Sequence, residues 1–136
     1  MDPLSITTAC VSLTATIAKT SLSVTSFVRA VRAARGDLDG VSRELASLTT
    51  ILGLLTEDAK DIDNFPEALR KNITGILINC DLVLVEIQRL VTKYDKAGVI
   101  AGSKWAFAGS EDVAKLQLSL EAHKSALEIA LEFMTL

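Results

Sequence analysis

Apolar residues recur at alternating four- and three-residue steps through the first long stretch of the chain. This spacing places them along one side of an α-helix. Lys19 is the only charged residue within residues 3–28. The stretch predicts a helix over about 3–34, ended by Gly36 in a left-handed conformation. Its apolar seam comprises Ile6, Cys10, Leu13, Ile17, Val24, Phe27 and Val31, with Thr20 between them.

A second apolar line runs along the same helix, well around the cylinder from the first. The remaining polar positions form a narrow strip of hydroxyl groups. A helix that is apolar over so wide an arc is the central helix of a bundle, a surface for self-association, or a segment that enters a membrane. The residues expected to carry the last two roles are Leu4, Ser5, Thr8, Val11, Ser12, Ala15, Thr16, Lys19 and Leu22.

As a membrane-spanning segment, however, this stretch is poor. Residues 4–28 are long enough to cross a bilayer core of roughly 30 Å at about 1.5 Å per residue. Serine and threonine are dense throughout, and Lys19 lies near the middle. The sequence therefore predicts a protein that is soluble at rest.

The same spacing predicts three further helices, and thus an all-α fold with a single domain over residues 1–136. We expect an up-down four-helix bundle with short connections. Gly75 lies inside the third seam, where glycine costs about 1 kcal/mol relative to alanine, and indicates a close helix crossing. The four helices are expected over about 3–34, 38–57, 65–97 and 110–134.

The segment 98–109, GVIAGSKWAFAG, is the one long loop that the pattern predicts, because three glycines interrupt it. Trp105 and Phe107 are its expected hydrophobic anchors, which plug one end of the bundle. The Gly-Ser-Lys within it lacks the spacing of a phosphate-binding loop, and no strand precedes it. Ser110 is then expected to cap the last helix.

Charge is unevenly distributed along the chain. The end of the first helix carries Arg29, Arg32 and Arg35, and residues 37–66 carry seven acidic residues against two basic ones. Pairing of the arginines with these acids is the favoured interpretation, and a patch for anionic lipid is the alternative. The net charge of −3 argues against nucleic acid as a partner.

The chemistry-bearing residues are sparse. His123, the only histidine, falls on an apolar seam and is expected to hydrogen-bond across the bundle. Cys10 and Cys80 also fall on seams, which predicts buried free thiols in a reducing, cytoplasmic compartment. With no secretory signal, no catalytic constellation and no set of metal ligands, we expect a protein that is not an enzyme and needs no cofactor.

Three segments together resemble a known family. The opening MDPLSIT, the stretch GVSRELASLTTILGLL and the block KWAFAGSEDVAKLQLSLEAHKSALEIALEFMTL are similar to the N-terminal domain of fungal STAND or NOD-like receptor proteins, in the HeLo-like group. The resemblance covers nearly the whole chain. It implies a helical signalling module that a nucleotide-binding domain normally follows. The chain ends at Leu136 without a nucleotide-binding domain, so we expect an isolated helical domain.

The resemblance leaves two functions open. Such domains oligomerise and are recruited to the plasma membrane, where the first helix inserts in programmed cell death, heterokaryon incompatibility and innate immunity. The alternative is a non-lytic adaptor that forms homo- or hetero-oligomers through its helices. The expected partners are thus a second copy of the chain and, on activation, membrane lipids.

Overall fold

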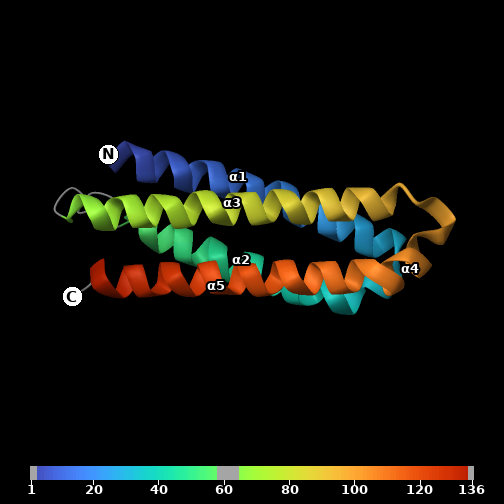
Figure 1. Cartoon of the computed structure of the whole chain (residues 1–136). Coiled ribbons are helices and arrows are strands. Elements are labelled where there is room, and N and C mark those ends of the chain that lie inside the picture. Colours follow the sequence, from blue (N-terminus) through green and yellow to red (C-terminus); the bar gives the residue numbers. More distant parts are fainter. Residues whose placement is uncertain (1–2, 58–64, 135–136) are drawn as a thin grey trace.

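The computed structural model describes residues 3–57 and 65–134, apart from the side chains of residues 3–5 and of Val99. This part of the chain forms four long α-helices and no strand (Figure 1). The predicted all-α bundle is therefore confirmed. The long helices are α1 (Pro3–Ala30), α2 (Arg35–Glu57), α3 (Glu67–Asp95) and α5 (Ser110–Met134).

The four helices alternate in direction along the chain, but their order in space differs from their order in sequence. The most extensive packing is between α1 and α3, which run side by side in the same direction (Figure 1). Helix α5 packs on α2 and α3, and α2 packs on α1. Helices α2 and α3, although consecutive, therefore lie on a diagonal of the bundle.

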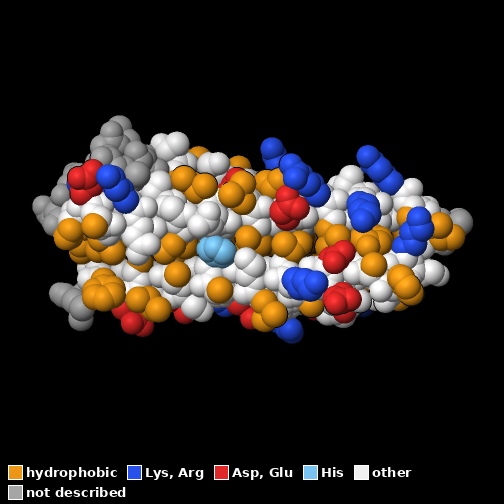
Figure 2. Space-filling view, viewed as in Figure 1, with side chains coloured by type: hydrophobic (Ala, Val, Ile, Leu, Met, Phe, Trp, Pro, Cys, Tyr) orange, Lys and Arg blue, Asp and Glu red, His pale blue; other side chains and the backbone are white. Residues whose placement is uncertain are grey.

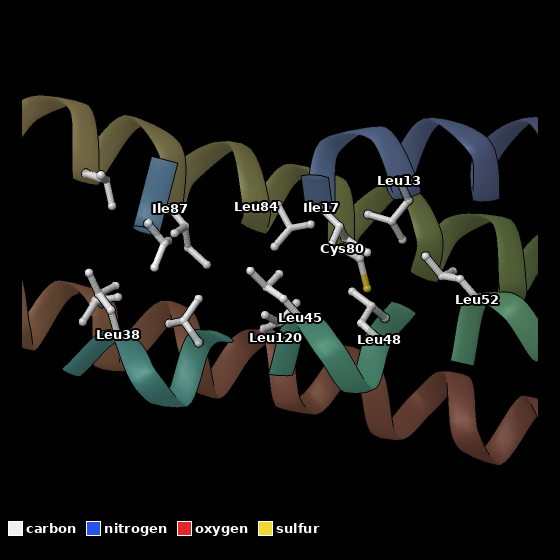
Figure 3. Close-up of a cluster of buried hydrophobic side chains, with 14 of the residues drawn as sticks. Leu13, Ile17, Leu38, Leu45, Leu48, Leu52, Cys80, Leu84, Ile87 and Leu120 are labelled. Carbon is white, nitrogen blue, oxygen red and sulfur yellow. The ribbon is translucent and has the colours of Figure 1, made fainter. Parts of the chain in front are cut away.

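The predicted seam of α1 is the face that the bundle buries. Ile6, Leu13 and Phe27 are at most 1% exposed, and Thr20, the one polar residue of the seam, is fully buried. The hydroxyl of Thr20 donates to the Thr16 carbonyl at 2.8 Å and accepts from the Gln88 amide of α3 at 2.8 Å. Figure 3 shows the same seam facing leucines of α2 and α5 and Cys80 of α3.

The expected end of the first helix is wrong. Helix α1 ends at Ala30, and a 3-10 turn, η1 (Arg32–Ala34), connects it to α2, so Gly36 lies inside the first turn of α2. Val31, with φ −128° and ψ 87°, leaves the helical region at the junction. Because Val31 and Ala34 are both buried, core packing sets this bend, and no left-handed glycine is needed.

The predicted loop 98–109 is also wrong, because these residues are helical. A 3-10 turn, η4 (Gly98–Ile100), is followed by α4 (Ala101–Lys104) and by a π-helical turn, η5 (Trp105–Gly109), which continues directly into α5. Ser110 has helical dihedrals, φ −62° and ψ −38°, and lies inside this continuous helix rather than capping it.

The two predicted anchors, Trp105 and Phe107, differ in burial. Trp105 is fully buried, whereas Phe107 is 92% exposed and anchors nothing within the described part of the chain. Side chains two residues apart on a helix point in nearly opposite directions. Once the segment is helical, only one of the two aromatic rings can enter the core.

Trp105 joins three other elements at this end of the bundle. Its ring centroid lies 5.1 Å from that of Phe27 in α1 and 5.5 Å from that of Tyr94 in α3, in tilted and edge-on geometries. Its indole Nε1 donates a hydrogen bond of 2.9 Å to Oδ2 of Asp37 in α2. The indole thus has a partner for its only donor, as a buried tryptophan requires.

The close helix crossing expected at Gly75 is absent. A Cβ built on Gly75 would meet nothing within 4 Å, whereas a Cβ on Gly109 would lie 2.6 Å from Cε3 of Trp105. The extra residue per turn of the π-helix places Gly109 directly under the Trp105 ring. The tight positions among the described glycines are therefore Gly109 of η5, under a rigid ring, and Gly40 of α2, against the flexible end of Gln117, and not Gly75.

We predict opposite effects for alanine at these two glycines. Gly109→Ala lowers the free energy of unfolding by about 1–3 kcal/mol, because the methyl group overlaps the Trp105 ring. Gly75→Ala raises it by about 0.5–1 kcal/mol, because alanine loses less backbone entropy in an open helical site. Urea unfolding of both variants measures the effect, and a Gly109→Ala variant as stable as the parent would contradict this packing.

We also predict that Asp37 contributes to stability through Trp105. Asp37→Ala leaves the buried indole N–H without an acceptor and lowers the free energy of unfolding by about 1–3 kcal/mol. Asp39→Ala is the comparison variant, because Asp39 lies just beyond the first turn of α2, is exposed and accepts no hydrogen bond from Trp105. Equal losses in the two variants would attribute the effect to the helix dipole instead of the hydrogen bond.

Candidate functional site

The outer face of α1 is the first candidate surface. Val11 is 65% exposed and Leu22 is 73% exposed, so the second apolar line of α1 is not covered by the bundle. Helix α1 is therefore a flanking helix, and the interpretation that it is the central helix is wrong. Of the predicted residues, Thr8, Ser12, Ala15 and Lys19 are exposed and Thr16 is half-buried; the side chains of Leu4 and Ser5 lie outside the described ones.

The exposed line has the spacing of a coiled-coil seam. Thr8, Val11, Ala15, Ala18, Leu22, Thr25 and Arg29 follow alternating three- and four-residue steps. Each of them lies two residues before a member of the buried seam, which places the two lines on nearly opposite sides of the helix. We call these seven residues the outer seam.

Two threonines near the outer seam, Thr14 and Thr16, satisfy their hydroxyl donors within the helix. Thr14 donates to the Cys10 carbonyl at 2.8 Å and Thr16 donates to the Ser12 carbonyl at 3.1 Å. A hydroxyl that already donates to its own backbone costs little more when water is removed from the surface. The α1 surface can therefore be covered by an apolar partner without leaving these donors unpaired.

Within the described residues, no helix has the length and hydropathy needed to cross a membrane. Helix α1 has only one charged residue, Lys19, before Arg29, but it still does not qualify because its many serines and threonines lower its mean hydropathy.

The three arginines meet in one groove, which is the second candidate surface. Arg29 ends α1, Arg32 begins η1 and Arg35 begins α2. They line a groove of about 720 Å³ together with Asp39. None of the three makes an ion pair or a side-chain hydrogen bond with another described residue.

Of the acids expected to pair with these arginines, Asp39 lines the groove without forming an ion pair, and none of the other described acids pairs with them. Helix α2 has 23 residues, so its rise places Glu57 about 33 Å from Arg35. Residues 58–64, which carry the rest of the acidic run, lie outside the described residues. Asp37, the nearest acid in sequence, accepts the hydrogen bond from Trp105. The sequence indicated the basic cluster, but it did not reveal the groove or the presence of Asp39 in it.

The face formed by α3 and α5 carries a different charge arrangement. Figure 2 shows lysines and arginines gathered over the C-terminal half of α3. Arg89 lies there and pairs with Glu86 at 2.8 Å on the same helix. Across the bundle, Lys124 of α5 pairs with Glu44 of α2 at 2.8 Å, with both side chains less than one-fifth exposed. The latter pair ties two helices together.

His123 and the two cysteines have structural surroundings. His123 is half-buried, and its Nδ1 donates to the Ser119 carbonyl at 2.6 Å. The predicted bond across the bundle is therefore wrong. The prediction of buried free thiols at Cys10 and Cys80 is confirmed. The described residues contain no group of three His, Cys, Asp or Glu side chains able to hold a metal ion.

Comparison with known proteins gives one family. The model of the family described as pigment biosynthesis cluster protein PigL N-terminal matches residues 1–136. No curated protein and no solved structure matches the chain significantly.

Burial predicts that both thiols are unreactive in the folded protein. Desolvation, assisted by the nearby carboxylate of Asp81, raises the pKa of Cys80 to about 12. Burial also raises the pKa of Cys10, partly offset by a hydrogen bond with Thr56. At pH 8 both groups are therefore protonated as well as inaccessible.

We expect a thiol-specific reagent to label neither cysteine at pH 8 until the protein unfolds, and to label both in denaturant. Mass spectrometry of the labelled chain measures this outcome. Labelling of Cys80 at the rate of a free thiol in the native protein would contradict the buried position.

Proposed function

The chain belongs to the fungal family of pigment biosynthesis cluster protein PigL N-terminal domains, and we propose that it serves as a helical assembly domain rather than an enzyme. In this proposal the outer seam of α1 binds the outer seam of a second copy. The observation that carries it is the exposure of Val11 and Leu22 on a line with coiled-coil spacing.

The composition of the outer seam supports helix-on-helix contact. Ala15 and Ala18 occupy its centre, and small residues let two helix backbones approach closely. Val11 and Leu22 flank them and supply apolar area. Lys19 is the only charge beside this part of the seam, and its flexible stem lets the ammonium group stay in water at the edge of a contact.

The non-catalytic part of the proposal rests on the surroundings of the titratable groups. The arginine groove is lined by three arginines, one carboxylate and hydroxyls, without a histidine or cysteine. Both thiols are buried, and the imidazole of His123 is engaged with its own helix. These groups do not converge on one site where a nucleophile and a base could act together.

A second candidate function, favoured by the position of the arginines, is recruitment to an anionic membrane surface in the cytoplasm. The outer seam leads from Val11 to Arg29, so the same surface is apolar along its length and basic at one end. This proposal keeps the role that the resemblance implies, a signalling or effector domain of the NOD-like receptor type. The helix would then lie on the membrane, since it is too polar to span one.

For the assembly proposal, we predict that lysine on the outer seam weakens self-association. Val11→Lys and Leu22→Lys each raise the dimer dissociation constant about tenfold or more, because an unpaired charge enters the contact. Leu118→Lys on α5 is the matched control, because Leu118 is also 65% exposed and α5 lies diagonally across the bundle from α1.

Sedimentation velocity over a range of concentrations measures the association of the three variants and the parent. A parent chain that stays monomeric at the highest concentration would refute the assembly proposal. Anionic vesicles test the second candidate with Leu22→Asp, which removes apolar area and adds a negative charge: binding or dye leakage that survives this change in a folded protein would refute a role of α1 at the membrane.

A further inference from the structure

The groove at the junction of α1, η1 and α2 has the chemistry of an anion site. Its walls carry the three guanidinium groups, and Thr25 and Ser42 add hydroxyl groups. Val24 and Val28 of α1 line its apolar part. A volume of about 720 Å³ lies within the range of small-molecule sites.

Local geometry explains why the arginines converge. They are spaced three residues apart across the end of α1, the 3-10 turn and the start of α2. In a 3-10 helix, side chains three residues apart eclipse each other, so Arg32 and Arg35 are presented to the same side. The positive end of the α2 dipole lies at the same corner.

Within the described part of the molecule, the positive charge of the three arginines is not balanced by acidic side chains. Asp39 is the only carboxylate lining the groove, and it makes no ion pair with Arg29, Arg32 or Arg35 within 4.0 Å. Three like charges are thus held together against one acid. The groove therefore carries an excess of positive charge, which favours an external anion.

We propose that this groove binds the phosphate groups of a phosphorylated small molecule or phospholipid headgroup. The planar guanidinium groups donate paired hydrogen bonds to phosphate oxygens, a geometry for which arginine is better suited than lysine. The hydroxyls of Thr25 and Ser42 are positioned to donate to further oxygens of the same ligand. The proposal does not require self-association along α1, because Arg32 and Arg35 lie outside that helix, although Thr25 and Arg29 belong to both surfaces.

Two arms of one experiment distinguish the sources of the phosphate. In the first, inositol trisphosphate is titrated into the protein and heat is measured by calorimetry. In the second, phosphatidylcholine vesicles with and without phosphatidylinositol bisphosphate are sedimented with the protein. Binding in the first arm alone indicates a free phosphorylated ligand, and binding to the vesicles with phosphatidylinositol bisphosphate indicates a headgroup presented by a bilayer. Either result supports the proposal if the arginine variants weaken the binding.

We expect Arg32→Gln and Arg35→Gln each to weaken binding about tenfold, the loss of one charge-assisted contact. Arg43→Gln is the matched control, because Arg43 is an exposed arginine of α2 that does not line the groove. Asp39→Asn should strengthen binding, because it removes the one negative charge from the site. This gain of affinity cannot result from misfolding.

Two outcomes would overturn the proposal. The first is an absence of binding in both arms. The second is a loss of affinity for Arg43→Gln as large as that for Arg32→Gln, which would assign the binding to overall charge and not to the groove. Circular dichroism of each variant accompanies the titrations, so that a change in binding is compared between folded proteins only.

Discussion

The burial of Trp105 determines how one end of the bundle is built. Its ring contacts Phe27 and Tyr94, and its N–H binds Asp37, so one side chain fixes the relative positions of α1, α2, α3 and the last helix. The π-helical turn is a consequence of this burial, because it places Gly109 under the ring and leaves room for it. Because the Trp105 contacts connect four helical elements, the junction between α1 and α2 can move little. The shape of the arginine groove depends on that junction.

Helix α1 shows how a bundle can leave a strongly apolar helix half uncovered. One seam is buried on α3 and α2, and the opposite seam remains open although it has the same three-four spacing. The small residues and internally bonded threonines explain why this surface tolerates water. Alanine exposes little apolar area, and the hydroxyls face solvent beside it. The same features let a second helix approach without stranded donors, so they suit both the isolated and the associated chain.

The sequence predicted the helices and the buried seam of α1 well, because that seam carries the larger and more continuous set of apolar side chains. It failed at the two connections. Gly36 and the glycines of residues 98–109 suggested breaks, but the burial of Val31, Ala34 and Trp105 overrode their weak helix propensity. Because this segment was predicted to be a loop, the opposite burial of Trp105 and Phe107 was not predicted. It follows only when the segment is helical.

For the candidate surfaces, the sequence indicated which residues belong to each surface, but not which other parts of the chain lie beside them. The exposure of Val11 and Leu22 was not predictable, because an apolar line on a helix does not reveal whether a partner within the chain covers it. The convergence of Arg29, Arg32 and Arg35 was foreseeable from their three-residue spacing. Their lack of an ion-pair partner among residues 3–57 and 65–134 was not, since it depends on the length and direction of α2.

The two proposed surfaces share residues, and this has a physical consequence. Thr25 and Arg29 belong to the outer seam and also line the groove. If two copies meet along the whole seam in parallel, their groove arginines approach one another, and the repulsion opposes association. A phosphate bound in each groove lowers that repulsion.

Because linkage is reciprocal, association would then raise the affinity for phosphate by the same factor. In an antiparallel pair the grooves lie at opposite ends, and the coupling vanishes. The presence or absence of this coupling therefore reports the orientation of the two helices.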